Sequence, residues 1–493
     1  LGFSVSTLES FFVGVAAGAA VLWGFSILKW GTRRSLAHRK AVNANARLLW
    51  RGEEGKSLIL MPFIVYSEFN SLGHVDLSEN KSMGGVAQSI ATDSANTTTN
   101  NRFVMSRLNG QWSQRFSADT RFEFKFGLGE SHFKSRFNQF ELGTSGLLNT
   151  MEESQSFKDL SQSWNGKLTQ VLQNGHQVVS GFELEGVRRT EDAVAEVADD
   201  AGNMRARTRR WAIYSQDEWS INPNWSAHAG LRYESILTEG INDEGEKRNK
   251  SGVLTPLLHA VWKPVPESRD QVRMSLTRSY KTPTLFNLVA RTALSREANS
   301  PTRPDRIGNP GLKPELATGI DLAVERYLSD GGVLSANIFR RNISDLIRYV
   351  TAERYDTVWA PGQRRFVSSP QNVGDAITQG LELEAKFRLD QVWSTVPAID
   401  VRSNLSFFNS RVLDVLGPNN RLDQQPKMTA NLGGDYRIRS IPLTLGGNVN
   451  INPDYITRRT EEQWVYQGSK RVVDVYGLWK FNPVTALRVT ISN

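Results

Sequence analysis

Apolar and polar residues alternate one by one along much of the chain, a pattern that predicts β-strands. In residues 121–128 (RFEFKFGL), every second residue from Phe122 to Leu128 is apolar, and the residues between them are charged or glycine. Residues 381–387 (LELEAKF) and 428–438 (MTANLGGDYRI) repeat the scheme. Because successive side chains of a strand point to opposite faces, each strand has one apolar and one polar face. Such strands fit either a soluble sandwich with an apolar core or a transmembrane barrel with its apolar face on lipid.

The lengths of the connections favour the barrel. We expect about eighteen strands, beginning near residues 42, 57, 101, 119, 159, 177, 208, 225, 251, 270, 315, 333, 374, 398, 427, 442, 470 and 486. Short connections alternate with long ones, and the long ones fall near residues 70–100, 134–158, 190–207, 238–250, 283–314, 349–373, 411–426 and 455–469. An up-and-down barrel with short turns on one side of the membrane and long loops on the other has this asymmetry. The pattern therefore predicts an all-β, antiparallel transmembrane barrel.

Tryptophan placement agrees with this interpretation. Seven tryptophans lie in or beside the short connections: Trp50, Trp112, Trp219, Trp225, Trp262, Trp393 and Trp479. Aromatic residues form girdles at the edges of membrane barrels, where one end of the ring is apolar and the other meets water. Ordinary packing explains any single tryptophan equally well, whereas the shared position of all seven favours a girdle.

The N-terminal segment does not follow the strand pattern. Residues 10–28 contain no charge and are long enough to span a bilayer as a helix. Glu9 precedes this stretch and basic residues from Lys29 to Lys40 follow it, the reverse of a secretory signal. We expect residues 1–41 to be an apolar helix and basic linker that are not native to the barrel, which occupies residues 42–493. A genuine membrane anchor with an external N-terminus is the alternative.

Charge and composition argue against a nucleic-acid-binding protein and against an enzyme. The net charge is +8, but five basic residues and one acidic residue of the first 40 account for half of it. The remainder has no basic stripe, so a nucleic-acid partner is not expected. The six histidines are dispersed, cysteine is absent, and no metal-ligand spacing, nucleophile elbow or phosphate loop occurs. We therefore expect neither a cofactor nor an enzyme.

Several segments resemble the barrels of TonB-dependent receptors, outer-membrane importers of iron chelates. They are SLTRSYKTPTLFNL (275–288), NPGLKPELATGIDLAVERYL (309–328), SANIFRRNISDLI (335–347), IYSQDEWSINPNWSAHAGLRYE (213–234) and the final ALRVTISN. The similarity extends over residues 42–493. Its most specific part is the motif Asn309, Pro310, Leu312, Lys313, Pro314 and Glu315.

The resemblance implies a fold and a location. The barrels of this family have about 22 strands around a plugged lumen. The last segment resembles the penultimate strand, so the first visible strand corresponds to the fourth and runs towards the periplasm. The chain would then hold about eighteen of the 22 strands, without the plug, the energy-coupling box, the first three strands or the last. We expect a barrel truncated at both ends, of poor stability in isolation, in the bacterial outer membrane.

The resemblance also implies a function: binding and import of a ferric siderophore or similar metal chelate, energised by the TonB complex. Arginine with tyrosine or tryptophan on external loops suits anionic, aromatic chelates. Candidate ligand-binding residues are Arg303 and Arg306, with Arg291 and Arg296, in one loop, and Arg354, Tyr355, Trp359, Arg364 and Arg365 in another. For any single arginine, contact with lipopolysaccharide phosphates or loop carboxylates is the alternative. Pro310, Gly311 and Pro314 are expected to fix a turn.

Other functions and partners remain open. A haem-importing relative would be expected to place a histidine in residues 281–312, and none occurs there. The expected partners are a metal chelate, the TonB complex, and outer-membrane lipid with lipopolysaccharide. The truncated chain is not expected to transport by itself. A passive porin is the first alternative function, and a barrel enzyme is the second.

Overall fold

The computed structural model is dominated by one antiparallel sheet. It describes residues 26–30, 33–53, 55–83, 86–143, 148–195, 202–242, 245–290, 292–295, 299–328, 331–459 and 463–493. In chain order the strands of this sheet are β1 (Ser26–Trp30), β2 (Arg33–Asn45), β4 (Ser57–Met83), β5 (Val86–Arg115), β6 (Thr120–Gly143), β7 (Leu148–Val171), β8 (His176–Ala195), β9 (Gly202–Asn222), β10 (Trp225–Asn242), β11 (Gly245–Trp262), β12 (Gln271–Lys281), β14 (Glu315–Tyr327), β15 (Val333–Ser344), β18 (Ala376–Arg388), β19 (Ile399–Val412), β20 (Met428–Arg437), β21 (Leu443–Asn452), β24 (Lys470–Lys480) and β25 (Ala486–Ser492). The short strand β3 (Leu48–Arg51) continues β2 along the edge of β4.

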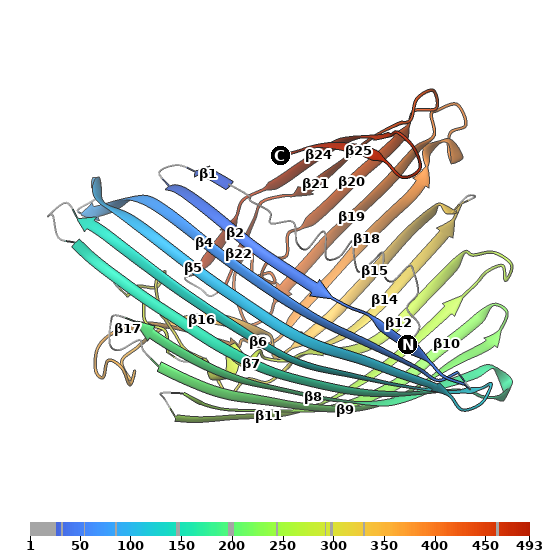
Figure 1. Ribbon diagram of the computed structural model, residues 1–493, viewed down its shortest axis with the longest axis horizontal. Coiled ribbons are helices and arrows are strands. Elements are labelled where there is room, and N and C mark those ends of the chain that lie inside the picture. Colours follow the sequence, from blue (N-terminus) through green and yellow to red (C-terminus); the bar gives the residue numbers. More distant parts are fainter. Residues whose placement is uncertain are drawn as a thin grey trace.

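Each strand of the large sheet pairs antiparallel with the next one in this order, as an up-and-down barrel requires. Within the described residues the pairing ends at β1 on one side and at β25 on the other. Figure 1 shows the sheet as a curved wall, with the N-terminal strands in blue and the C-terminal strands in red. All of the strands predicted from the sequence are present.

Smaller elements lie in the connections. Two further sheets combine β13 (Asp305–Arg306), β16 (Ile347–Arg354) and β17 (Arg365–Asn372), and β22 (Tyr455–Arg458) with β23 (Trp464–Gln467). The helical turns are η1 (Gln173–Gly175), α2 (Leu285–Val289) and η4 (Leu389–Gln391). Within the described ranges, no helix combines the length and the apolar composition needed to cross a membrane.

Side-chain exposure shows which face of the sheet is apolar. Ile213 and Leu254 are 55% and 45% exposed, whereas Ala212 and Val253, one position earlier in each strand, are 1% and 5% exposed. The opposite face carries charged residues such as Glu234, which is 1% exposed. The large apolar side chains therefore lie on the outer surface, as in a barrel that faces lipid. The alternative of a soluble sandwich, in which they would converge on a shared core, is wrong.

The tryptophans beside the short connections form part of this outer surface. Trp225 and Trp262 stack with ring centroids 6.1 Å apart, and Trp219 stacks on His176 at 5.0 Å. All three tryptophans are exposed, and they lie at the ends of β9, β10 and β11 that meet the short turns. The predicted aromatic girdle is confirmed on these strands.

The N-terminal prediction needs correction where the structure can be compared with it. Residues 10–25 of the expected helix lie outside the described residues. Residues 26–28, the end of that segment, belong to β1, and the expected basic linker from Arg33 onward belongs to β2. The linker prediction failed because Leu36 and Val42 lie in the outward phase of the alternation, and β2 satisfies its backbone groups by pairing with β4, where Leu36 lies opposite Leu72.

Four of the predicted long loops are instead continuations of the strands. β4 and β5 extend to Met83 and Val86, and β6 to β11 likewise pair across most of the segments expected to be loops. No proline occurs between Pro62 and Pro223 or between Pro223 and Pro256, so no missing N–H group interrupts these ladders. The connections after β12, β15 and β19 contain prolines, and there the chain leaves the large sheet as predicted.

Candidate functional site

The loop between β12 and β14 folds back over the inner face of the sheet. Leu288 and Val289 of α2 and Leu312 are each 2% exposed, and they pack against Met204 and Ala206 of β9. The first turn of α2 is capped by Thr284, whose side chain accepts a hydrogen bond from the N–H of Asn287 at 3.2 Å. This buried cluster anchors the loop, so the polar residues that follow have fixed positions.

The motif from Asn309 to Glu315 crosslinks three parts of the external rim. Asn249 of β11 donates hydrogen bonds to the carbonyls of Pro310 and Leu312, both at 2.8 Å. Asn309 donates to the carbonyl of Pro370 at 3.0 Å, and Glu315 accepts from the N–H of Ile347 at 2.8 Å. Lys313 exchanges hydrogen bonds with Asn372, its N–H donating at 2.9 Å and its carbonyl accepting at 3.1 Å, and Lys281 lies 3.3 Å from Glu315. The motif thus holds the loop in place through backbone groups and buried side chains.

The two loops that carry the predicted ligand-binding residues form a single small sheet. β13 pairs in parallel with β17, which pairs with β16, so Asp305 and Arg306 lie beside Val367 and Ser368. Sequence spacing treated the loops as separate, whereas the structure brings them together. Arg291 and Arg296 lie outside the described residues.

Asp305 lies at the centre of this small sheet, where its carboxylate accepts hydrogen bonds from Arg365 and Trp359. The carboxylate is fully buried; it accepts two hydrogen bonds from Arg365 at 2.8 and 2.7 Å and one from Trp359 Nε1 at 3.0 Å. Burial alone would raise the pKa of Asp305, but the hydrogen bonds from Arg365, the Ser295 N–H and Trp359 outweigh it and hold the pKa below its ordinary value. Two of the predicted ligand residues therefore stabilise the loop.

The other predicted residues remain nearer the surface. In the β16–β17 hairpin, Arg354 pairs with Asp356 through two bonds of 2.8 Å, and Arg364 pairs with Glu353 at 2.7 Å. Tyr355, which is 55% exposed, donates to Glu353 at 2.7 Å. Arg303 and Arg306, in the loop between β12 and β14, are also exposed. These side chains are accessible to a ligand, although the hairpin arginines already have carboxylate partners.

A more concentrated positive site lies among residues that the sequence analysis did not select. We name the group of Arg348, Arg421, Arg458, Arg459 and Asp423 the arginine box; Arg348 and Arg459 contact the carboxylate, and Arg421 and Arg458 contact Arg348 through their carbonyls. Arg348 is 2% exposed, lies 3.1 Å from Asp423, and donates to the carbonyls of Arg421 and Arg458. Arg459 lies 3.9 Å from the same carboxylate. The Nε of each of the four arginines is buried without a hydrogen-bond partner in the described structure.

The arginine box has more positive charge than its surroundings neutralise. The guanidinium groups of Arg348 and Arg459 lie 3.1 and 3.9 Å from Asp423, whereas that of Arg458 lies over the Trp464 ring and donates to the carbonyl of Leu416 at 2.8 Å. Burial lowers the pKa of Arg348; Asp423 opposes this shift and Arg459 adds to it. Arg459 and Asp423 are 38% and 33% exposed, so the box has an open side. The residues come from three separate connections, and the adjacent pair Arg458–Arg459 was the one local signal in the sequence.

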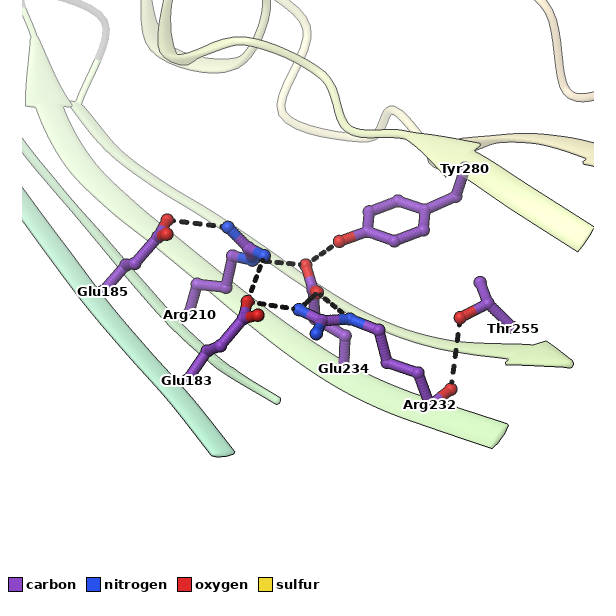
Figure 2. A network of polar contacts seen from close by, with 7 residues as sticks. All are labelled: Glu183, Glu185, Arg210, Arg232, Glu234, Thr255 and Tyr280. Carbon is purple, nitrogen blue, oxygen red and sulfur yellow. Dashed lines mark hydrogen bonds and ion pairs between the residues drawn. The ribbon is translucent and has the colours of Figure 1, made fainter. Parts of the chain in front are cut away.

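The inner wall of the sheet holds a second charged network (Figure 2), formed by Glu183 and Glu185 of β8, Arg210 of β9, and Arg232 and Glu234 of β10. Arg210 bonds Glu234 at 2.6 Å, Glu185 at 2.7 Å and Glu183 at 3.0 Å. Arg232 bonds Glu183 at 2.6 Å and Glu234 at 2.7 Å. The hydroxyl of Tyr280, from the end of β12, also donates to Glu234. With its charges paired across adjacent strands, this network stabilises the wall.

Comparison with known proteins identifies the fold. A family model described as "TonB dependent receptor-like, beta-barrel" matches residues 65–493. The chain belongs to the TonB-dependent receptor family. As a member of this family it is an outer-membrane β-barrel of a receptor class, which confirms the resemblance, the fold class and the location predicted from the sequence. No curated protein matches the chain by sequence.

Solved structures of TonB-dependent receptors have the same fold at low sequence identity. The ferric-catecholate import receptor Fiu of E. coli is 13% identical, with a TM-score of 0.56 over 94% of this chain and 75% of its own. The alcaligin receptor FauA of Bordetella pertussis is 14% identical, with a TM-score of 0.52 over 94% and 71%. The copper transporter OprC is 12% identical, with a TM-score of 0.60 over 95% and 77%.

Proposed function

We propose that this receptor binds an anionic metal chelate of the ferric-siderophore type at its external loops and imports it with energy from the TonB complex. The arginine box is the observation that supports an anionic ligand. The metal is cargo that arrives inside the chelate. Tyr355 and the accessible arginines at 303, 306, 354 and 364 are secondary contacts in this proposal.

The physical argument rests on charge. Four guanidinium groups with one carboxylate leave an excess of positive charge, and buried donors without partners carry a desolvation cost of about 1–3 kcal/mol each. An anionic group at the open side, near Arg459, reduces the repulsion among the four cations. Arginine is suited to this role because its planar fork can donate two parallel hydrogen bonds to a carboxylate or catecholate.

The names of the similar structures agree with this class of ligand. Two of them are described as receptors for ferric-catecholate and for alcaligin, and a third as a copper transporter. These descriptions apply to those proteins, and they motivate testing siderophores of several chemical types.

The experiment measures equilibrium binding of ferric catecholate, ferric hydroxamate and ferric citrate to the purified protein in detergent, with and without Arg421→Gln/Arg459→Gln. Loss of two charge-assisted contacts is expected to weaken binding of the preferred anionic chelate about 10- to 100-fold. The matched control is Arg388→Gln, which removes a 42% exposed, ion-paired arginine from the opposite rim and is expected to leave affinity unchanged.

Uptake of the same radiolabelled chelate by cells that express the gene tests transport. Uptake that requires the TonB complex supports the proposal, and uptake that persists without it favours the passive porin. Equal affinity of wild type and the double variant for every chelate would contradict the role of the arginine box.

A further inference from the structure

Two of the histidines meet on the inner wall of the sheet. His228 of β10 lies directly opposite His259 of β11, and their ring centroids are 6.4 Å apart with the ring planes at 77°. Both occupy the inward phase of their strands, the phase of Glu234 and Val253, which are 1% and 5% exposed. Each histidine is itself partly exposed, so the rings are accessible from the inner side of the wall.

No hydrogen bond to a described residue holds either ring in place, whereas His176 is bonded to Asp217 at 2.7 Å. Both rings can therefore turn about their side-chain bonds. Two imidazoles that share one metal ion, at about 2.0–2.1 Å from each nitrogen, have ring centroids about 5–6 Å apart. Because the two histidines are direct cross-strand neighbours, a small rotation of the rings brings a nitrogen of each to a shared point.

The charge beside the pair favours a cation. Glu218 of β9 lies directly opposite His228, and its carboxylate accepts hydrogen bonds from Gln177 at 2.9 Å and from Gln216 at 2.8 Å. Both donors are neutral amides. Within the described part of the chain, no cation is paired with this carboxylate.

The other charges on this part of the inner wall are already paired. Ser275 of β12, opposite the second histidine, donates to Asp321 of β14 at 2.9 Å, and Asp321 is paired with Arg341 at 2.7 Å. Arg273, the preceding inward residue of β12, is paired with Glu325. The arginines of the network in Figure 2 have carboxylate partners as well. One carboxylate without a cationic partner thus lies beside two imidazoles.

We propose that His228 and His259 bind a divalent transition-metal ion of the Cu²⁺, Ni²⁺ or Zn²⁺ class through one nitrogen each, with water in the remaining positions. Imidazole is the commonest protein ligand for these ions, whereas hard cations such as Mg²⁺ prefer oxygen. Among the described residues no group of three His, Cys, Asp or Glu side chains forms a metal site, so Glu218 acts on the ion through its charge.

This site is separate from the proposed chelate site. His228 and His259 lie three residues from Trp225 and Trp262, which mark the end of the wall that carries the short turns. Three residues span about 10 Å along a strand. The arginine box lies in the long connections at the other end of the strands, so the two proposals stand independently.

The test titrates the chlorides of Cu²⁺, Ni²⁺, Zn²⁺ and Mg²⁺ into the purified, tag-free protein in detergent, with calorimetry as the readout. We expect one tightly bound Cu²⁺ per chain, weaker binding of Ni²⁺ and Zn²⁺, and no measurable binding of Mg²⁺. Electron paramagnetic resonance of the Cu²⁺ complex should show coupling to two nitrogens. Coupling to fewer nitrogens in the wild type, or Mg²⁺ binding at the affinity of Cu²⁺, would overturn the proposal without any variant.

Substitution shows whether both histidines bind the same ion. His228→Gln and His259→Gln should each weaken Cu²⁺ binding at least about tenfold, and the double variant should lose little more, because each single change already destroys the two-nitrogen site. The matched control is His132→Gln, which removes an exposed histidine from the outward phase of β6 and should bind Cu²⁺ as the wild type does.

An unchanged heat-modifiable band shows that each variant barrel is intact. Two-nitrogen coupling that persists in either single variant would contradict the proposal. So would losses that add up in the double variant, or a control that loses as much affinity as the paired histidines do.

Discussion

The external rim has two halves in which the connections between strands are ordered in different ways. From β4 to β11 the strands continue far beyond the length needed to cross the membrane, and almost all of the connecting chain is paired. Between β12 and β24 the long connections leave the large sheet and fold into loops around Asp305, Leu312 and the arginine box. The two halves differ in their prolines. The connection after β12 has prolines at 283, 301, 304, 310 and 314, which prevent ladder pairing, whereas residues 70–100, 134–158, 190–207 and 238–250 have none.

The difference has functional consequences. An extended hairpin satisfies its backbone groups by itself, so it needs little further packing; the outward face of β9 is open at Arg205, Arg207 and Arg209, whereas Met204 and Ala206 on its inner face are covered by α2 and Leu312. A loop must bury side chains to gain a fixed structure, and the buried carboxylates of Asp305 and Glu315 in the second half are held by hydrogen bonds as a result. Specific polar sites are therefore concentrated where proline interrupts the sheet.

The largest expected effect comes from removing the centre of the folded half. Asp305→Ala leaves the Arg365 guanidinium without its partner, and Trp359 and the Ser295 N–H lose their acceptor. Breaking such a buried pair costs about 3 kcal/mol or more. Hydrogen exchange of the amides in β16 and β17 should accelerate accordingly. Asp356→Ala, which breaks the exposed pair with Arg354, should cost less than about 1 kcal/mol.

Leu312→Ala tests whether the folded half depends on its apolar anchor. Leu312 is 2% exposed and packs with Leu288, Val289 and Met204, so its truncation leaves a cavity costing about 2–3 kcal/mol. Limited proteolysis of the connection between β12 and β14 should become faster, while β4 to β11 remain protected. Equal loss of protection in both halves would show that they do not fold as separate units.

Thr98→Pro places a proline in the extended half, where the paired strands have none at this position. Thr98 pairs with Leu72 on one side and Asn138 on the other, so proline removes a ladder donor and leaves an acceptor unpaired. The expected cost is about 1–2 kcal/mol, confined to the outer parts of β4, β5 and β6. New protease cleavage near this position, with an unchanged heat-modifiable band, is the expected result. An undisturbed hairpin would show that proline does not explain the difference.

The smallest effect is the pH dependence of the folded half. The pKa of Asp305 is lower in the folded protein than its ordinary value, so its contribution to stability is present above the unfolded pKa of about 3.9 and is lost as pH falls through the folded value. Exchange of the β16 and β17 amides should therefore accelerate in acid in the wild type. Asp305→Asn should lack this dependence.

The alternation of apolar and polar residues predicted most of the fold, but it predicted little of the candidate site. Alternation such as Leu254 beside Val253 identified the strands and the lipid-facing side, because period-two patterning is written in adjacent residues. The same reasoning also places Arg205, Arg207 and Arg209 in the outward phase of β9. The proline-free segments were also readable as strands.

The arginine box could not be found in this way. Arg348, Arg421 and Arg458 are separated by more than 30 residues of chain between neighbours, and the packing of three connections brings them together. The commitment of Arg365 and Trp359 to Asp305 was equally hidden, because nothing in the sequence shows that Asp305 is buried. Residue types in a loop indicate what can bind a ligand, whereas burial decides which of them are free to do so.

The apolar face of the sheet meets lipid while the charged face lines the interior. Because the chain has no cysteine, single fluorophores can be placed at Leu184→Cys and Glu185→Cys, neighbours on β8 that are each 45% exposed. In proteoliposomes, a quencher attached to lipid should quench the label at 184, and a water-soluble quencher should quench the label at 185. Equal quenching at both positions, or the reverse order, would show that the two faces are not oriented in this way.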